Sequence, residues 1–137
     1  MVMKWLDQAA YACAARWSGL YCVTVSVGTI RFRRPILVGH LVELEAKVVH
    51  TGSTSMHIFV QVRSGDSKSG ELAETNHCII TFVALDEQGN TAKVPVWQPE
   101  TPEDKFLEQY AIQMKQFSQQ VEQQMLDFYQ AGSTGAP

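Results

Sequence analysis

The sequence predicts an α+β domain in which one N-terminal helix lies against an antiparallel sheet. Residues 3–17 have the composition of a helix, residues 21–85 alternate apolar and polar residues over several segments, and residues 101–128 repeat apolar residues every three or four positions. Alternation with a period of two is typical of a half-buried strand, whereas the longer spacing is typical of an amphipathic helix. A helix followed by consecutive strands is typical of the α+β class.

The length and the composition predict one domain and exclude several classes of protein. The chain has 137 residues and a formal net charge of -3, which gives no basic surface for nucleic acid or for an anionic membrane. No apolar run approaches the roughly 18 residues that span a bilayer, and no secretory signal is visible. Three widely spaced cysteines favour reduced thiols, so we expect a soluble cytoplasmic protein.

The first helix, residues 3–17, is apolar nearly all round and should end near Ser18 and Gly19. A helix of this kind is normally buried. It carries one carboxylate, Asp7, near its N-terminal end. A buried charge is usually paired, shifted in pKa or functional, so Asp7 is a candidate general base or nucleophile. The alternative is a structural carboxylate that the helix dipole favours in the first turn.

The strand pattern covers residues 21–32, 40–50, 54–63 and 72–85. Residues 51–53 predict a hairpin turn, residues 86–90 a second turn, and residues 93–97 a short extension. Four strands and one helix make a thin, one-sided core. We therefore expect a second chain to cover the open face or to extend the sheet edge, which gives a dimer.

The C-terminal segment predicts a long helix that begins with Thr101 as its cap and Pro102 in its first turn. Its apolar residues form a narrow stripe, which consists of Phe106, Tyr110, Met114, Phe117, Val121, Met125 and Phe128. The stripe predicts either packing on the same domain or a coiled-coil or partner contact. We divide the chain into a domain at 1–99, a helix at 100–130 and a flexible tail at 131–137.

Two local features are candidates for binding an anion. The stretch from Gly52 to Ser55 offers backbone amides and three hydroxyls that suit a phosphate, or it is an ordinary polar hairpin turn. The arginines of the second feature either meet an anionic ligand or form a solvated strand end. They are Arg31, Arg33 and Arg34.

The histidines and cysteines do not predict a metal site. His40, His50, His57 and His77 have no ligand spacing with the cysteines, so we expect surface or hydrogen-bonded core histidines. A cysteine nucleophile is unsupported, because Cys78 lies in a segment with the pattern of a core strand.

A string of motifs runs through the chain in a fixed order. They are MKWLDQAA at 3–10, VT at 23–24, FRRPILVG at 32–39, TGSTSM at 51–56, TFVALD at 81–86 and VP at 94–95. This string resembles the acyl-coenzyme A thioesterases of the hot-dog fold, in their bacterial and cytosolic branch. The resemblance implies a long central helix wrapped by an antiparallel sheet, chains that pair into dimers and often into trimers of dimers, and active sites between protomers.

The resemblance also implies the roles of particular residues. Asp7 would be the catalytic carboxylate, which activates water or attacks the thioester, and amides at the helix start would stabilise the oxyanion. No metal or separate cofactor is implied, because coenzyme A belongs to the substrate and the product. The residues expected to contact the substrate or coenzyme A are Thr24, Arg33, Arg34, Gly52, Ser53, Thr54 and Ser55.

The chain departs from the family pattern at its start and at two positions. Members usually carry a first strand and an Asn-containing loop ending in His-Gly-Gly before this helix, whereas residues 1 and 2 stand there here. His40 and His57 replace the usual Asp and Glu. A start codon set too late, a truncated chain and a member with reduced activity are all compatible with this pattern.

Three functions follow, in order of preference. The first is an acyl-CoA thioesterase, and the second is a non-catalytic oligomer that binds acyl-CoA or serves as an assembly module. A hydratase or dehydratase is less favoured, because it would need a His near the helix start. The acyl-chain length is not readable, since Trp17, Met56, Phe59 and Phe82 are either pocket or core residues.

Overall fold

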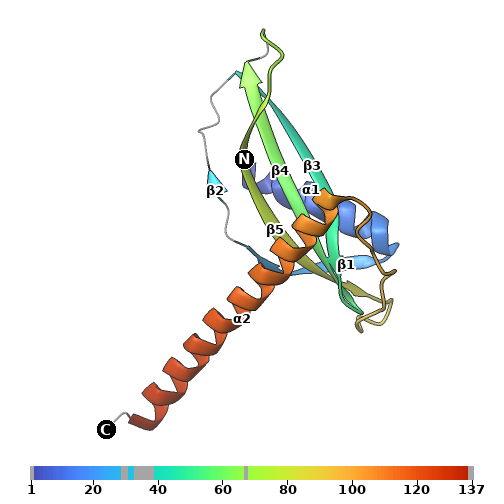
Figure 1. The fold of residues 1–137 in the computed structure, drawn as a ribbon. Coiled ribbons are helices and arrows are strands. Elements are labelled where there is room, and N and C mark those ends of the chain that lie inside the picture. Colours follow the sequence, from blue (N-terminus) through green and yellow to red (C-terminus); the bar gives the residue numbers. More distant parts are fainter. Residues whose placement is uncertain (1, 29–30, 33–38, 67, 136–137) are drawn as a thin grey trace.

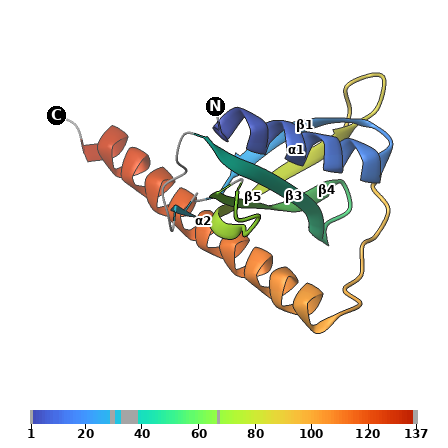
Figure 2. The same cartoon turned by 90° about the horizontal axis from the view of Figure 1, so that it is seen from above.

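The computed structural model describes residues 2–28, 31–32, 39–66 and 68–135. The chain forms three layers, with helix α1 (Val2–Ser18) on one face of a sheet and helix α2 (Pro102–Gly135) crossing the other face. Figures 1 and 2 show both helices and the sheet between them. Among the described residues, no helix is long and apolar enough to cross a membrane.

The sheet is antiparallel and runs in the order β1–β5–β4–β3, and β2 also pairs with β5. The strands are β1 (Tyr21–Val27), β2 (Arg31–Phe32), β3 (His40–Thr51), β4 (Ser55–Asp66) and β5 (Ala73–Leu85). The predicted α+β class and the hairpin between β3 and β4 are confirmed.

Helix α1 packs on the sheet along one face only. Leu6, Ala10 and Ala14 recur every four residues, and each is at most 1% exposed. The helix ends as predicted, because Gly19 adopts a φ of 69° and its N–H donates to the carbonyl of Ala15. Our expectation of burial on all sides is wrong, since the small residues of the outer faces have no described element to pack against.

The main core lies between α1 and the sheet. Met56, Ile58, Val60 and Val62 of β4 alternate toward α1 and are fully buried, as is Phe82 of β5. Burial of each such side chain stabilises the fold by about 1.5–3 kcal/mol. Met56 and Phe82 are therefore core residues rather than pocket residues.

One strand prediction needs correction. The segment 21–32 is not one strand, because β1 shifts its register against β5 between Thr24 and Ser26 and ends at Val27. Residues 93–97, the predicted short extension, do not join the sheet. Instead, the Val94 N–H donates to the Ser53 carbonyl, and the Trp17 indole N–H donates to the Pro95 carbonyl. The segment thereby joins the β3–β4 turn to the C-terminal end of α1.

Helix α2 begins with the predicted cap. The Thr101 hydroxyl accepts a hydrogen bond from the Asp104 N–H at 3.0 Å, and the Asp104 carboxylate accepts one from the Thr101 N–H at 3.3 Å. A further hydrogen bond from the Glu100 N–H is the main reason why the pKa of Asp104 lies below its ordinary value. The side chains of Thr101 and Asp104 thus accept hydrogen bonds from each other's backbone N–H groups at the helix start.

We expect Thr101→Ala to lower the free energy of unfolding by about 1 kcal/mol, because it removes the acceptor for an otherwise unpaired amide of the first turn. Urea denaturation measures the change. Thr91→Ala, at an exposed residue whose backbone forms an isolated bridge with Leu85, is the matched control and should change the value by less than about 0.5 kcal/mol. Equal losses in both variants would contradict the role of the cap.

Only the first half of α2 packs on its own domain. Leu107 and Ala111 are buried against Val49 and Ile79, and three half-buried side chains complete this cluster. They are Phe59, Tyr110 and Met114. From Lys115 onward, every side chain that the structure describes is exposed. The helix continues to Gly135, so residues 131–135, which we expected to be a flexible tail, are helical.

Candidate active site

Asp7 lies on the second turn of α1, and its side chain is exposed. No hydrogen bond or ion pair joins it to another residue among those that the structure describes. The expectation of a buried charge is therefore wrong. The dipole explanation is weak as well, because Asp7 is the sixth residue of α1 and the dipole acts mainly within the first turn. Neither structural reading explains a carboxylate here.

Thr24 lies on the same side of the sheet as Asp7. It pairs with Phe82 across β1 and β5, and paired residues direct their side chains to the same face. Phe82 faces α1, where its ring meets the ring of Tyr11 edge-on with the centroids 6.2 Å apart. Tyr11 stands one helical turn after Asp7. The structure thus places both predicted residues on the α1 side, with both side chains exposed.

The turn from Gly52 to Ser55 lies at the other end of α1. Gly52 donates to the Ser55 carbonyl, and the carbonyls of Ser53 and Thr54 accept from Val94 and Ala84. The Trp17–Pro95 hydrogen bond fixes this region to the last turn of the helix. Ten helical residues separate Asp7 from Trp17, a rise of about 15 Å. Within one chain, the turn is therefore not brought together with Asp7.

The structure does not place the side chains of the predicted arginines relative to Asp7 or to the turn at residues 52–55. Arg33 and Arg34 lie outside the described residues. Arg31 belongs to β2, where its backbone pairs with His77 of β5.

Three of the histidines have polar partners, as expected. His50 Nδ1 lies 3.0 Å from Glu108 of α2, His57 Nδ1 lies 3.0 Å from the Thr81 hydroxyl, and His77 Nδ1 lies 2.9 Å from Glu74. Among the described residues, no three potential ligands gather into a metal site.

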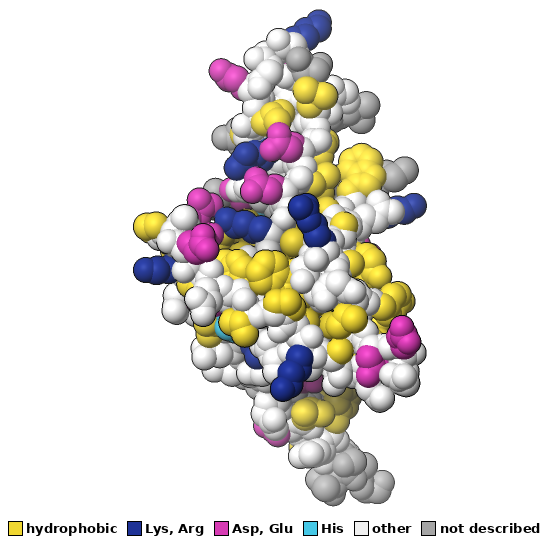
Figure 3. Space-filling view, turned by 90° about the vertical axis from the view of Figure 1, so that its right-hand side faces the viewer, with side chains coloured by type: hydrophobic (Ala, Val, Ile, Leu, Met, Phe, Trp, Pro, Cys, Tyr) yellow, Lys and Arg dark blue, Asp and Glu magenta, His cyan; other side chains and the backbone are white. Residues whose placement is uncertain are grey.

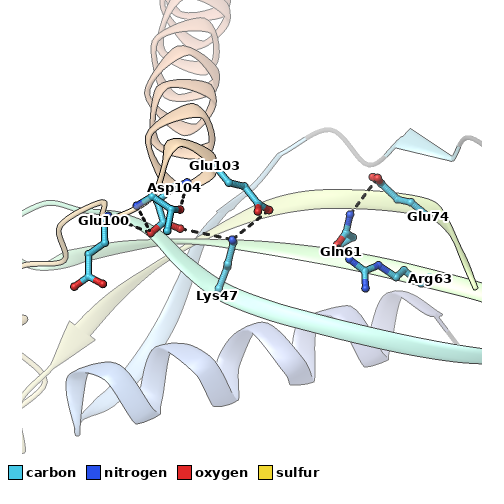
Figure 4. Close-up of polar contacts among 8 residues, drawn as sticks. Lys47, Gln61, Arg63, Glu74, Glu100, Glu103 and Asp104 are labelled. Carbon is cyan, nitrogen blue, oxygen red and sulfur yellow. Dashed lines mark hydrogen bonds and ion pairs between the residues drawn. The ribbon is translucent and has the colours of Figure 1, made fainter.

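A cavity that the sequence does not predict lies between the sheet and the first turns of α2. Its volume is about 490 Å³. Figure 4 shows its two polar ends, with Lys47 beside Glu103 and Asp104 at one end and Gln61, Arg63 and Glu74 at the other. Phe59 and Leu107 contribute apolar walls. The described cations, Lys47 and Arg63, already lie near carboxylates, so this cavity is a weaker candidate than Asp7.

The cavity depends on a register shift that no sequence pattern reveals. Val62 pairs with Asn76, but the next residue, Arg63, pairs with Glu74. This shift brings Glu74 and His77 within 2.9 Å of each other although they are three residues apart in a strand. His77 also lies 3.3 Å from the hydroxyl of Tyr110.

The cysteines are unsuited to nucleophilic catalysis. Burial raises the pKa of the Cys78 thiol to about 11, and burial likewise raises the pKa of Cys13. A protonated thiol is a poor nucleophile. Cys78 is a core residue of β5, as its sequence pattern predicted.

A second hollow lies between α1 and the edge strand β3. Its volume is about 690 Å³, and Trp17, Ala46, Val48 and Trp97 are among the residues that line it. Figure 3 views the molecule from the right-hand side of Figure 1, and hydrophobic side chains gather over the middle of this surface between charged groups. Strands β3 and β1 are the two edges of the described sheet.

His57 makes the stability of the domain sensitive to pH. Burial, aided by the charges of His50 and Lys115, lowers its pKa from 6.5 to about 4. Between these values the unfolded chain binds a proton that the folded chain does not, so stability falls as the pH falls through this window. We expect the free energy of unfolding to drop by about 2 kcal/mol between pH 7 and pH 5 from this group.

Urea denaturation of the wild type and of His57→Gln at both pH values measures this contribution. The variant should lose about 2 kcal/mol less than the wild type over the same interval. His40→Gln, which replaces a half-buried histidine at the start of β3, is the control. An identical pH dependence in wild type and His57→Gln would refute the assignment.

Comparison with known proteins identifies the family. Residues 1–71 match the thioesterase superfamily, and the four-stranded antiparallel sheet with its helices matches solved structures of acyl-CoA hydrolases. The chain belongs to this superfamily. Its fold is the hot-dog fold, as the motif string predicted.

Curated relatives include two bacterial proteins of similar identity. The chain is 36% identical to protein VdlD of Helicobacter pylori over 73% of its own length and 57% of the relative. It is also 36% identical to YkhA of Bacillus subtilis, called an uncharacterized acyl-CoA thioester hydrolase, over 82% of this chain and 65% of the relative. The chain thus spans about three fifths of the length of these relatives.

Solved relatives cover more of the chain. An acyl-CoA hydrolase from Bacillus cereus is 30% identical with a TM-score of 0.79, over 98% of this chain and 78% of that one. A hexameric acyl-CoA thioesterase is 34% identical with a TM-score of 0.83, over 88% and 78%. An acyl-CoA hydrolase of Staphylococcus aureus, solved with butyryl-CoA and coenzyme A, is 29% identical with a TM-score of 0.82, over 95% and 80%.

Proposed function

We propose that this protein hydrolyses an acyl-CoA thioester to a free carboxylic acid and coenzyme A. The observation that carries the proposal is Asp7, an exposed carboxylate without a described partner, on the helix that lies within the family match. An unpaired carboxylate on an otherwise apolar helix has a clear use as a general base or nucleophile.

The spacing of two residues supports the same assignment. Structures of the Staphylococcus aureus hydrolase include two alanine variants, one of an Asp and one of a Thr. These two residues are seventeen positions apart in its sequence. Asp7 and Thr24 are also seventeen residues apart and lie on the same side of the sheet. A third variant of that hydrolase replaces an Asn fifteen residues before its Asp, a position outside the present sequence. We therefore propose Asp7 as catalytic and Thr24 as its neighbour at the substrate.

The chemistry follows from the carboxylate. Asp7 takes a proton from water while the hydroxide forms a bond to the thioester carbonyl carbon. The tetrahedral oxyanion collapses, the carbon–sulfur bond breaks, and the thiolate of coenzyme A takes up the proton. In the alternative, the carboxylate attacks the carbonyl, the carbon–sulfur bond breaks, and coenzyme A leaves as a thiolate that takes up a proton from water. Water then hydrolyses the resulting anhydride and regenerates the carboxylate. Unpaired amides at the start of α1 would stabilise the oxyanion in either route.

The remaining predicted contacts concern coenzyme A. The turn from Gly52 to Ser55 lies about 15 Å along α1 from Asp7, so it would contact the coenzyme rather than the thioester. Arg33 and Arg34 carry charges that suit the phosphates of the coenzyme.

We propose that the active protein is a dimer, and a trimer of dimers in its full assembly. An exposed Asp7 needs a cover to exclude bulk water, and a neighbouring protomer would supply it. Two solved relatives are described as hexameric. A cytoplasmic location fits a relative named the cytosolic acyl coenzyme A thioester hydrolase of Homo sapiens.

Two measurements on the wild-type protein test the function. Release of coenzyme A from acetyl-, butyryl- and palmitoyl-CoA is followed with a thiol-trapping dye, and binding of coenzyme A is followed by calorimetry. We expect saturable release with at least one chain length. Binding of coenzyme A without release from any of the three would instead favour the non-catalytic acyl-CoA-binding module.

A further inference from the structure

We propose that the second half of α2 pairs with the same helix of a second copy of this chain. This segment, residues 115–132, carries large apolar side chains that nothing in the described chain covers. Phe117 is 59% exposed, Phe128 68% and Tyr129 62%. Figure 1 shows the helix running well beyond the edge of the sheet.

A helix in this position gains stability from a partner. Most helical stability in proteins comes from packing an apolar face on another element. Within the segment, the Gln123 side-chain amide donates a hydrogen bond to the Asp127 carboxylate, and the rings of Phe128 and Tyr129 meet edge-on. Packing of the exposed stripe on a partner would therefore stabilise the segment.

The stripe repeats every eleven residues. Phe106, Phe117 and Phe128 are eleven residues apart, as are Tyr110 and Val121, and so are Met114 and Met125. Eleven residues in three turns give 3.67 residues per turn, close to the 3.6 of a straight helix. The stripe therefore stays on nearly the same side of α2 over its whole length. Such a repeat is typical of helices that pair with only a slight right-handed supercoil.

A helix with the same repeat is the partner that fits this stripe. The exposed repeat from Phe117 to Phe128 extends over about 16 Å, and a partner of matching period keeps its side chains in register over that length. Helix α2 of a second copy has this same period, because its sequence is identical. It also gives a self-complementary contact, as symmetric assemblies need.

The charge of the segment also favours a second copy. Between Gln116 and Gln130 only Glu122 and Asp127 are charged, and six of these fifteen residues are glutamines. Glutamine both donates and accepts hydrogen bonds, so identical flanks are compatible with each other. A strongly charged partner, such as a basic protein or a nucleic acid, would find little to complement.

The area of the contact indicates its place in the assembly. An aromatic side chain buries about 150–250 Å², so two stripes would bury several hundred Å² in total. A stable interface usually buries about 1,200–2,000 Å². The helix contact is therefore expected to join units that the hot-dog domains have already formed, rather than to hold two monomers together alone.

Analytical ultracentrifugation of the full chain tests the proposal. Val121→Glu/Met125→Glu places two charges in the stripe at exposed positions, so the domain should still fold. Gln116→Glu/Gln123→Glu adds the same charges away from the stripe and is the matched control. We expect the assembly of the stripe variant to have at most half the mass of the wild-type assembly, and the control to have the wild-type mass. Equal masses for all three proteins, or a monomeric wild type, would overturn the proposal.

Disulfide cross-linking provides an independent test that measures contact rather than mass. Gln124 flanks the stripe, three residues after Val121, whereas Gln123 lies on the opposite side of the helix. We expect Gln124→Cys to form several-fold more interchain disulfide than Gln123→Cys under mild oxidation, with the wild type as background. Equal yields from both variants would contradict a contact through the stripe. Neither test uses thioester hydrolysis, so the proposal stands or fails independently of the proposed activity.

Discussion

Asp7→Asn is expected to lower kcat for acyl-CoA hydrolysis by about 10²–10⁴-fold, because the amide cannot take a proton from water or attack a carbonyl. The fold should be unaffected. Asp7 is exposed and has no described partner, so its replacement should change the free energy of unfolding by less than about 0.5 kcal/mol. Thiol release and urea denaturation of the same protein preparations measure both quantities.

Matched variants separate chemistry from position. Gln8→Ala changes the neighbouring exposed residue on α1 and should keep nearly full activity. Thr24→Ala should reduce kcat/KM by a smaller factor than Asp7→Asn, since a hydroxyl positions a substrate without performing the proton transfer. If Gln8→Ala loses as much activity as Asp7→Asn, the effect belongs to the helix surface and not to the carboxylate.

The second large effect concerns the core that supports this site. Phe82→Ala is expected to lower the free energy of unfolding by about 3–5 kcal/mol. Phe82 is fully buried, and its ring packs edge-on against Tyr11, so the substitution leaves a cavity beneath α1. Domains are stable by only about 5–15 kcal/mol, so the loss is a large share of the total. Urea denaturation, or thermal unfolding if the variant is too unstable, measures it.

Phe106→Ala is the control for this substitution. The Phe106 ring is 70% exposed, and its loss should cost less than about 0.5 kcal/mol. Comparable losses in the two variants would mean that the α1–sheet core is not the main source of stability.

Local sequence patterns predicted the features that depend on a few neighbouring residues of the chain, namely the buried face of a strand and the ends of the helices. The alternation of Met56, Ile58, Val60 and Val62 identifies one face of β4, because a strand has a side-chain period of two. Gly19 and Thr101 mark helix ends because left-handed backbone and side-chain caps are properties of single residues. These predictions needed no knowledge of what lies next to each element.

Features that depend on neighbours were not predictable. An apolar helix does not reveal which of its faces meets the sheet, so Asp7 was expected inside and lies outside. The apolar stripe of α2 has the same pattern along its whole length, yet Met114 packs on the sheet and Phe117 is 59% exposed, and no local pattern distinguishes the two. The register shift near Thr24 and the one opposite Thr75 are set by pairing between strands, and no local pattern encodes them.

Chemical rescue tests most directly whether the Asp7 carboxylate performs the chemistry. The rate of coenzyme A release by Asp7→Ala is measured with and without added formate, which can enter the space that the side chain leaves at this exposed position. The account predicts a rate far below that of the wild type, and a saturable recovery with formate that wild type and Gln8→Ala do not show. An Asp7→Ala protein that releases coenzyme A at the wild-type rate without formate would contradict it.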